Sequence, residues 1–350
     1  MITSIEELPQ KLASSVTQKE KDFIAEIKCK GLLPFAVTSH FASLAGPEKD
    51  DPIRRQFFPD PRETENDPFS LDDPLGECYH YAAPSLVHQY RDRALLRAAK
   101  SCAGCCRYCF RRVWISQNSQ SDVSDDISEA AFLYLAENTG IHEVLVSGGD
   151  PLTLDNDRLE KLLLSLRKIR SCLKLRICTR IPVTEPSRLD NETIAIFNKF
   201  RPLSLSTHIN HERELSQQSR VALAACVNAG IAVKVQTVLL KGINDNAEIL
   251  CGLFHSCLEL GLSPYYLFQL DLAPGTAHFR VPLKSGLAIW QELSKIIAPP
   301  SLPVYALDLP GGGGKIHLHK NVIAGERVSA KGAEYVLKDS KGIEWYYPID

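Results

Sequence analysis

The sequence lacks any long, uninterrupted hydrophobic run. Of its 350 residues 44% are hydrophobic, yet no apolar stretch reaches the length of about 18 residues that crosses a bilayer. The first 30 residues also lack the apolar core of a signal peptide. We therefore expect a globular cytoplasmic protein without a membrane partner.

An excess of charge of one sign is also missing. Lysine and arginine number 40 and aspartate and glutamate 42, so the formal net charge is -2. Such a balance provides no general basic field that would attract nucleic acid. We expect no direct nucleic-acid partner, and other partners must be inferred from a site.

Cysteine is too sparse for a disulfide-stabilised module, with 11 residues in the chain. The odd count in a cytosolic protein favours free thiols and metal ligands. Seven cysteines lie in apolar or mixed surroundings, where we expect small buried hydrophobic side chains. These are Cys29, Cys78, Cys172, Cys178, Cys226, Cys251 and Cys257.

The remaining cysteines cluster in one short run. Cys102, Cys106 and Cys109 have the spacing C-x3-C-x2-C. Three such thiolates can hold three irons of a four-iron four-sulfur cluster and leave the fourth iron open to a small molecule. A zinc site or a chance group of buried thiols is the alternative. Zinc sites usually have a fourth ligand and repeated C-x2-C pairs, which we do not find, and Cys105 shows that not every thiol here is a ligand.

From about residue 94, short apolar runs alternate with segments of helical periodicity. The expected strands are 94–99, 143–146, 173–178, 203–207, 233–239, 265–270 and 304–307. The expected helices are 127–138, 157–169, 191–199, 214–229, 246–260 and 284–297. This alternation predicts parallel strands joined by right-handed crossovers. An incomplete (β/α) barrel and a doubly wound open sheet both fit, and both bind ligands at the carboxyl ends of their strands.

Polar residues occupy several of these strand ends. Gly148, Gly149 and Asp150 follow the second expected strand, where a glycine pair lets the backbone approach a ligand closely or forms an ordinary turn. His208 follows another strand, and Gln236 interrupts the next one. A solvated loop or a bond between strands would explain these two residues equally well.

Two carboxylates and a lysine follow the last expected strands. Asp271 and Asp308 either converge at one mouth of the barrel or cap turns. Four glycines then precede Lys315, and a linker or a mobile loop that delivers an amine would account for them. The run is not a Walker loop, because Ile316 stands where that motif needs serine or threonine. A lysine amine suits Schiff-base chemistry with an aldehyde cofactor.

Taken together, these motifs resemble the lysine 2,3-aminomutase family from about residue 35 to residue 325. The resemblance rests on the cysteine loop, the run Ser-Gly-Gly-Asp-Pro-Leu from residue 147, and the run Asp-Leu-Pro-Gly-Gly-Gly-Gly-Lys from residue 308. It also rests on Tyr265 and Tyr266 followed by Asp271. It implies an isomerase with a [4Fe-4S] cluster, S-adenosyl-L-methionine and pyridoxal 5'-phosphate on an incomplete (β/α) barrel of the radical S-adenosylmethionine type. The implied reaction abstracts hydrogen from carbon 3 of lysine and moves the amino group from carbon 2, which gives β-lysine.

The resemblance also implies roles for individual residues. The implied cluster ligands are Cys102, Cys106 and Cys109. Lys315 matches the lysine that forms the internal aldimine, and Arg93 matches the arginine that binds the cofactor phosphate. The implied S-adenosylmethionine turn is Gly148, Gly149 and Asp150, and the residues that line the cofactor region are His208 and Gln236.

Three further residues bear on the substrate. Arg111 matches the arginine that pairs with the substrate carboxylate, while Asp271 and Asp308 match the carboxylates that hold its far amino group. A doubly acidic pocket repels the side chain of glutamate, so lysine is the expected substrate. An aminomutase acting on another amino acid and an iron-sulfur electron-transfer protein without mutase activity are the alternatives.

Two biological roles fit this family. One is a free-standing lysine 2,3-aminomutase, and the other is the relative that supplies (R)-β-lysine for the modification of elongation factor P. The run 106–112 and the lack of a C-terminal cysteine cluster favour the second role. The partners implied are L-lysine, an electron donor such as flavodoxin or ferredoxin, and a downstream ligase with elongation factor P.

The composition changes along the chain predict three regions. Residues 1–92 form a helical and irregular arm, which we expect to wrap a larger body, and proline and acidic residues cluster at 42–77 within it. Residues 93–300 form the partial barrel. Residues 301–350 carry the lysine loop and a short C-terminal extension.

Overall fold

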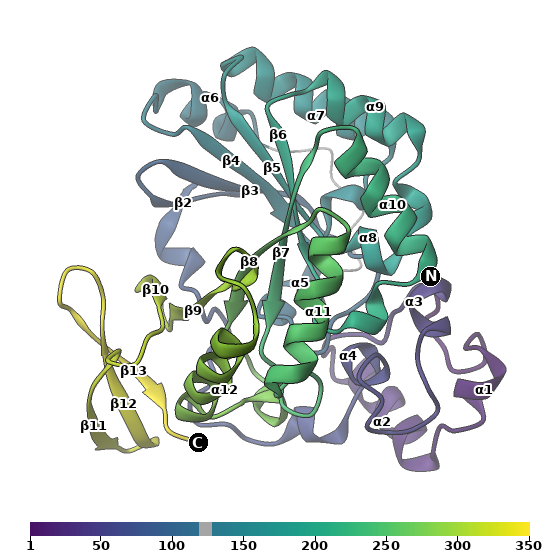
Figure 1. Cartoon of the computed structure of the whole chain (residues 1–350), viewed down its shortest axis with the longest axis vertical. Helices are drawn as coiled ribbons and strands as arrows, with labels where there is room; N and C mark the ends of the chain where they lie inside the picture. Colours follow the sequence, from purple (N-terminus) through teal and green to yellow (C-terminus); the bar gives the residue numbers. More distant parts are fainter. Residues whose placement is uncertain (119–127) are drawn as a thin grey trace.

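Seven parallel strands form the centre of a ten-stranded sheet in this computed structural model, which describes residues 1–118 and 128–350 (Figure 1). They are β3 (Arg93–Ala99), β4 (Glu143–Gly148), β5 (Lys174–Thr179), β6 (Leu203–His208), β7 (Ala232–Val238), β8 (Ser263–Phe268) and β9 (Val304–Leu309). All seven expected strands are thus confirmed, and each of their ends lies within two residues of its expected position.

The strands follow one another in the sheet in the same order as in the chain. A doubly wound sheet would reverse its strand order at a switch point, so this succession shows barrel-type winding. The antiparallel strands β1 (Tyr81–Ala83) and β2 (Leu86–Tyr90) extend one edge, and β10 (Gly314–His317) extends the other. The expected incomplete barrel is therefore confirmed.

Six crossover helices cover the parallel strands, as predicted. They are α6 (Glu129–Glu137), α7 (Asn156–Ile169), α9 (Asn191–Lys199), α10 (Gln217–Asn228), α11 (Ala247–Glu259) and α12 (Leu283–Ile296). Residue 127, the expected start of the first helix, lies outside the described residues. In α7, Leu159, Leu162, Leu163 and Leu166 recur at helical spacing and are buried, while Asp155 caps the helix start.

Side chains alternate between the two faces of each strand. On β5, Leu175 and Ile177 belong to the hydrophobic core under the helices, whereas Arg176 bonds to Glu143 of the neighbouring strand at 2.6 Å and 3.1 Å. Cys178 lies on the same face of β5 as Arg176 because it is two residues further along the strand. The face of β5 that carries Arg176 is consequently polar.

The N-terminal arm has a hydrophobic cluster of its own and lies at the lower right of Figure 1. Its helices are α1 (Gln10–Ala13), α2 (Gln18–Cys29), α3 (Ser39–Ser43) and α4 (Arg54–Phe57). Thr17 and Glu20 form a capping box at the start of α2, and Glu20 also pairs with the buried Arg54 at 2.7 Å. Gln56 connects the arm to the barrel through a 2.9 Å hydrogen bond to Glu214.

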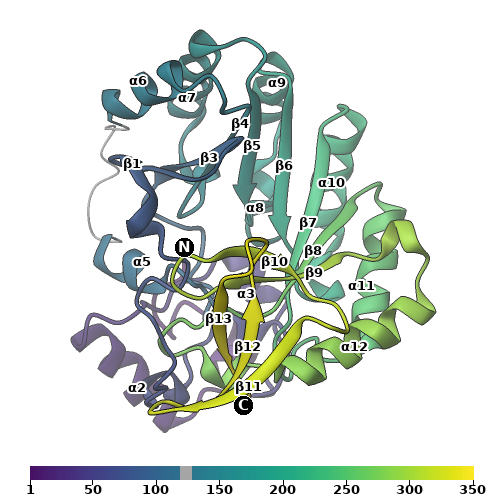
Figure 2. The ribbon, with the colours of Figure 1, turned by 90° about the vertical axis from the view of Figure 1, so that its left-hand side faces the viewer.

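A separate antiparallel sheet follows the barrel, seen in front in Figure 2. It consists of β11 (Ile323–Ser329), β12 (Gly332–Lys338) and β13 (Glu344–Pro348). The ten-stranded sheet crosses both expected domain boundaries, because β1 and β2 precede residue 93 and β9 and β10 follow residue 300. The division into three regions stays a prediction.

The cysteine environments correct part of the sequence prediction. Cys226 and Cys257 are buried as expected, but Cys29, Cys78 and Cys172 are exposed. Ile27 and Leu173, which lie close to Cys29 and Cys172 in the sequence, are buried, so apolar neighbours in the sequence do not show whether a cysteine is buried. Among the described residues, no helix has both the length and the apolar character needed to cross a membrane.

Candidate active site

The loop between β3 and α5 (Arg112–Asn118) brings the three expected cluster ligands together. Burial and the nearby thiols, Cys109 first, raise the pKa of Cys102 well above its usual range. Burial and Cys106 raise the pKa of Cys109 to about 11. Without a metal these poorly solvated groups are therefore protonated thiols, and a bound metal would supply the positive charge that stabilises their thiolate form.

A site for a single metal ion such as zinc and a four-iron cluster place different demands on the thiols of this loop. Within residues 1–118 and 128–350, no three His, Cys, Asp or Glu side chains are grouped to hold a single metal ion. In a four-iron cluster each thiolate binds a different iron, so the sulfurs need not meet at one point.

Cys105 lies in a small hydrophobic cluster beside this group, against which Cys102 also packs. It packs with the buried residues Leu33, Ala36 and Ile115, and its N–H donates to the carbonyl oxygen of Ala36 at 2.8 Å. Burial raises the pKa of its thiol to about 12. Cys105 thus anchors the loop on the arm and belongs to the core.

The glycine pair at the end of β4 packs against the cysteine loop. A Cβ atom at Gly149 would collide with the carbonyl oxygen of Ser101 and lie 3.1 Å from Cys102 Sγ. Gly148 has a φ of +114°, and a Cβ atom there would collide with the carbonyl oxygen of Ala99. Glycine is needed at both positions for the turn to approach the loop this closely.

Asp150 is buried behind this turn and is fully engaged by the protein. Its carboxylate accepts hydrogen bonds from Thr179 Oγ1 at 2.7 Å, from the Arg180 N–H at 2.7 Å and from the Leu152 N–H at 3.0 Å. These contacts tie the end of β4 to the end of β5. The position of Asp150 therefore fixes the shape of the turn.

Lys315 lies on the strand β10, which corrects the expectation that it lies on a mobile loop. The chain turns at 310–313, and β10 pairs with β9 so that Lys315 is directly opposite Asp308. Lys315 Nζ lies 2.5 Å from Asp308 Oδ2 and 4.0 Å from the centre of the Phe268 ring. Its backbone N–H donates to the Tyr90 hydroxyl at 3.0 Å. The strand pairing thus places the amine at the carboxylate.

The glycine turn before Lys315 is held by the N-terminal arm. The Gly311 N–H donates to the carbonyl oxygen of Pro74 at 2.8 Å, and Gln89 Nε2 donates to the carbonyl oxygen of Gly312 at 3.1 Å. Gly311 and Gly312 have φ values of +79° and +102°, which favour glycine. These contacts fix the approach of β10 to the site.

Asp271 and Asp308 are brought together, which is the first of the two alternatives that the sequence left open. Burial and the charge of Asp308 raise the pKa of Asp271 to about 8, while Lys315 and Arg111 oppose this shift. The four groups therefore act on one another electrostatically. They form a site in which two carboxylates share two cations.

Arg111 faces a carboxylate from the arm. Its Nε lies 3.2 Å and 3.1 Å from the two oxygens of Glu77, which belongs to the 3-10 helix η2 (Glu77–His80). Arg111 Nη1 lies 3.4 Å from Ser147 Oγ. The Nε edge of the guanidinium is thereby occupied, while Nη1 makes the longer contact.

The remaining expected residues flank this group. His208 lies opposite Gln236 in the pairing of β6 with β7. Burial and Arg180 lower the pKa of His208 to about 4, so its imidazole is neutral near pH 7. Arg93 begins β3, pairs with Asp92 at 2.9 Å and lies 4.0 Å from the centre of the Tyr90 ring. Tyr90 therefore contacts both Arg93 and Lys315.

Sequence reasoning missed four polar residues of this region. Arg180 follows β5 directly, so the rule that singled out the other strand ends could have found it. Gln56, Glu77 and Glu214 carry no such signal, because the first two belong to the arm and Glu214 ends the 3-10 helix η5 (Glu212–Glu214). Only the folded chain shows which side chains they meet.

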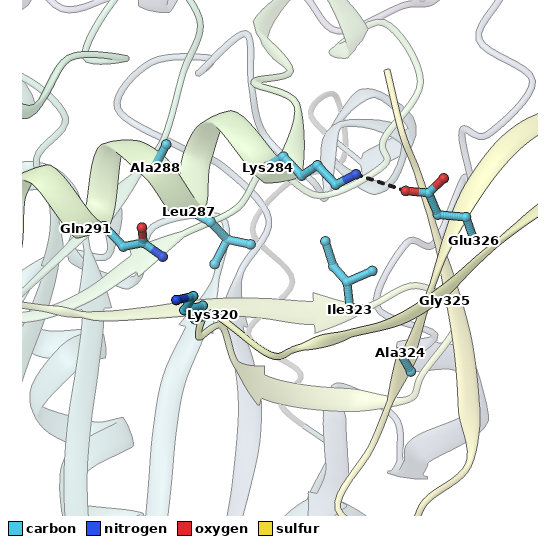
Figure 3. Close-up of a pocket in the computed structure, with 9 residues that line it drawn as sticks. All are labelled: Lys284, Leu287, Ala288, Gln291, Lys320, Ile323, Ala324, Gly325 and Glu326. Carbon is cyan, nitrogen blue, oxygen red and sulfur yellow. Dashed lines mark hydrogen bonds and ion pairs between the residues drawn. The ribbon is translucent and has the colours of Figure 1, made fainter.

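A surface pocket lies away from these residues, between α12 and the segment 320–326 (Figure 3). Its volume is about 410 Å³, and Lys284 pairs with Glu326 across it at 2.9 Å. None of the expected site residues lines it. The chemistry inferred from the sequence does not lie there.

Comparison with known proteins agrees with this geometry. A family model described as "4Fe-4S single cluster domain" matches residues 92–185. The L-lysine 2,3-aminomutase of Clostridium subterminale is 32% identical over 98% of this chain and 80% of its own length. A Treponema pallidum (strain Nichols) protein, whose name carries the same activity as a provisional assignment, is 44% identical over 76% of this chain and 75% of its own.

Two further proteins complete the comparison. The glutamate 2,3-aminomutase of Clostridioides difficile (strain 630) is 35% identical over 92% of this chain and 75% of its own length. Among solved structures, Streptococcus suis SuiB gives a TM-score of 0.46 at 13% identity and covers 63% of this chain and 50% of its own.

The cysteine loop and the barrel-type winding, together with the lysine 2,3-aminomutase relatives and the family model, define the class as a radical S-adenosylmethionine enzyme of the isomerase type. Within that class, the chain belongs to the lysine 2,3-aminomutase family. Its cofactors are accordingly a [4Fe-4S] cluster, S-adenosyl-L-methionine and pyridoxal 5'-phosphate.

Proposed function

We propose that this enzyme converts L-lysine to β-lysine. The observation that carries the proposal is the pair Asp271 and Asp308, which share one site with Lys315 and Arg111. L-Lysine carries one carboxylate and a distant ammonium group. Arg111 and the two carboxylates offer complementary charges at two places in this site.

The residues of the chain suit the three cofactors of the family. When bound, the cluster and S-adenosylmethionine supply an organic radical, and pyridoxal phosphate supplies a conjugated ring that spreads an unpaired electron. We assign the cluster to Cys102, Cys106 and Cys109, which are half-buried and share one loop. The S-adenosylmethionine turn is assigned to Gly148 and Gly149, which pack against that loop.

The remaining assignments concern pyridoxal phosphate. Lys315 offers the amine that binds the cofactor covalently, with the rings of Phe268 and Tyr266 centred 4.0 Å and 5.2 Å from Nζ. Arg93 offers a planar guanidinium for the phosphate. His208 and Gln236 line the cofactor region, and the neutral imidazole can donate or accept a hydrogen bond there. Asp150 acts by holding the S-adenosylmethionine turn in shape.

Lysine and glutamate are the two candidate substrates, because the relatives include an aminomutase named for each. Glutamate would place its side-chain carboxylate beside Asp271 and Asp308, and like charges repel strongly in a desolvated site. An equimolar mixture of L-lysine and L-glutamate, given to the anaerobically reconstituted enzyme, tests this choice. Mass spectrometry should show β-lysine as the main product, and a majority of β-glutamate would overturn the proposal.

For the biological role, we propose that the product is (R)-β-lysine for the modification of elongation factor P. The run 106–112 supports this branch of the family over a free-standing lysine mutase. A flavodoxin or ferredoxin would deliver the electron, and a ligase would use the product. Chiral chromatography of the product is the first test, since (S)-β-lysine would contradict this role.

A further inference from the structure

A buried arginine and a buried glutamate lie directly beside the cysteine loop. Arg180 Nη1 donates a hydrogen bond to Cys106 Sγ at 2.9 Å. Arg180 Nη2 lies 3.0 Å from Glu214 Oε2. The side chains of Arg180 and Glu214 are 10% and 0% exposed. One guanidinium therefore joins a cluster cysteine to a carboxylate out of reach of solvent.

The position of this pair is fixed from several sides. Gln56 Oε1 accepts from Arg180 Nη2 at 2.5 Å and from Asn210 Nδ2 at 3.0 Å, and Gln56 Nε2 donates to Glu214 Oε1 at 2.9 Å. The Phe41 ring lies 4.8 Å from the guanidinium carbon. Gln56 and Phe41 belong to the N-terminal arm, so the arm holds a charge at the cluster loop.

Such a pair acts on a cluster through its charge and its hydrogen bond. The reduction potential of an iron-sulfur cluster depends on the net charge around it and on hydrogen bonds to its sulfurs. A cation and an N–H donor at a ligand sulfur favour the reduced cluster, which has gained an electron. A carboxylate behind that cation opposes the effect, and both influences are strong where the dielectric constant is low.

We propose that Arg180 and Glu214 set the reduction potential of the cluster bound by Cys106. Arg180 raises the potential, and Glu214 limits the rise. The proposal rests on the proposed function in one respect, since it needs the cluster on Cys102, Cys106 and Cys109. Arg180 is here a positioning residue that acts through the sulfur of Cys106.

Two neutral variants test the proposal by the sign of their effects. Arg180→Gln and Glu214→Gln are reconstituted anaerobically, and their midpoint potentials are measured by dithionite titration followed by electron paramagnetic resonance. Arg180→Gln should shift the potential negative and Glu214→Gln should shift it positive. We expect each shift to match at least a tenfold change in the reduction equilibrium, which is about 59 mV for one electron. General loosening of the structure would not produce opposite signs.

Two further variants serve as controls. Arg180→Lys keeps the charge and should shift the potential less than Arg180→Gln. Arg176→Gln removes another buried arginine of the same region, one that pairs with Glu143 at 2.6 Å. The potential of Arg176→Gln should differ less from that of the wild type than the potential of either Arg180→Gln or Glu214→Gln does. Iron content and thermal unfolding are measured for every protein.

The outcomes separate the two claims. A wild-type chain that binds no iron would overturn the proposed function itself. Unchanged potentials, or shifts of the same sign, in variants that retain iron would overturn the inference alone. If Arg180→Gln loses its iron, Glu214→Gln decides, because a positive shift supports the pair and an unchanged potential overturns it.

Discussion

Asp271 shows how burial changes the chemistry of an ordinary carboxyl group. Its pKa rises to about 8 because of burial and the neighbouring Asp308. The side-chain ammonium of lysine keeps its proton up to about pH 10, so it binds best once Asp271 has lost its own proton. The KM for L-lysine should fall as the pH rises towards 8 and then level off.

The variant Asp271→Asn should lose this pH dependence, because an amide does not titrate in that range. Steady-state kinetics across the pH range provides the measurement. A KM that is independent of pH in the wild-type enzyme would contradict the role of Asp271.

The same pKa shift affects folding. Between the ordinary pKa of 3.8 and about 8, the folded chain keeps a proton on Asp271 that the unfolded chain has lost. The contribution of this group to the free energy of unfolding therefore falls as the pH rises through that window. Chemical denaturation at several pH values should show a weaker decline for Asp271→Asn than for the wild type, and equal declines would contradict the shift.

Lys315 and Cys106 should fail independently when each is replaced. Lys315→Ala should abolish the absorbance of lysine-bound pyridoxal phosphate and keep the iron content. Cys106→Ala should lose the cluster and keep the cofactor absorbance, because the two residues lie on different elements. Absorption spectra and iron analysis of both variants provide the check. Joint loss of both signals in each variant would contradict the separate roles.

At the scale of single residues, the strand-end rule predicted much of the site. Asp271, Asp308 and His208 could be singled out because the carboxyl ends of parallel strands meet at one edge. Glu77 could not, since its place beside Arg111 depends on how the arm folds over the barrel. A contact between residues 34 positions apart leaves no local trace in the sequence.

At the scale of elements, the main difference concerns the segment that carries Lys315. The four glycines suggested a flexible connection, and the structure shows a hairpin between β9 and β10. The strand β10 has only four residues and starts with Gly314, so neither its length nor its composition indicates a strand. The seven parallel strands, by contrast, are longer and rich in apolar residues, and their positions were predictable.

The contact between the arm and this hairpin predicts a stability difference between two glycines. Gly76 and Gly31 both have a φ of +61°, but only at Gly76 would a Cβ atom meet a backbone, 2.7 Å from Gly311 C and Gly312 N. Gly31→Ala should lower the free energy of unfolding by about 1 kcal/mol, from the strain of the left-handed backbone alone. Gly76→Ala should lower the free energy of unfolding by clearly more than Gly31→Ala does. It should also bind pyridoxal phosphate more weakly. Denaturant unfolding and cofactor titration test this, and equal losses would show that the contact is unimportant.

At the scale of the whole molecule, the arm supplies charges to the cysteine loop of the barrel. Glu63, 1% exposed in the 3-10 helix η1 (Pro61–Thr64), pairs with Arg107 and Arg112 on either side of Cys109. Glu63→Gln leaves two buried arginines without a counter-charge and should cost roughly 3–5 kcal/mol of unfolding free energy. Iron loading should fall with it.

A surface pair provides the control for this prediction. Glu160 pairs with Lys199, and the two side chains are 37% and 62% exposed. Glu160→Gln should change the free energy of unfolding by about 1 kcal/mol or less. If the two variants lost the same stability, Glu63 would not anchor the cluster loop to the arm.

The measurement closest to the central claim is the product formed from L-lysine. The protein is reconstituted anaerobically with iron, sulfide and pyridoxal phosphate, and receives S-adenosylmethionine, a reductant and L-lysine. Mass spectrometry after derivatisation should show β-lysine only when every cofactor is present. Formation of deoxyadenosine without β-lysine would contradict the assignment of L-lysine as the substrate.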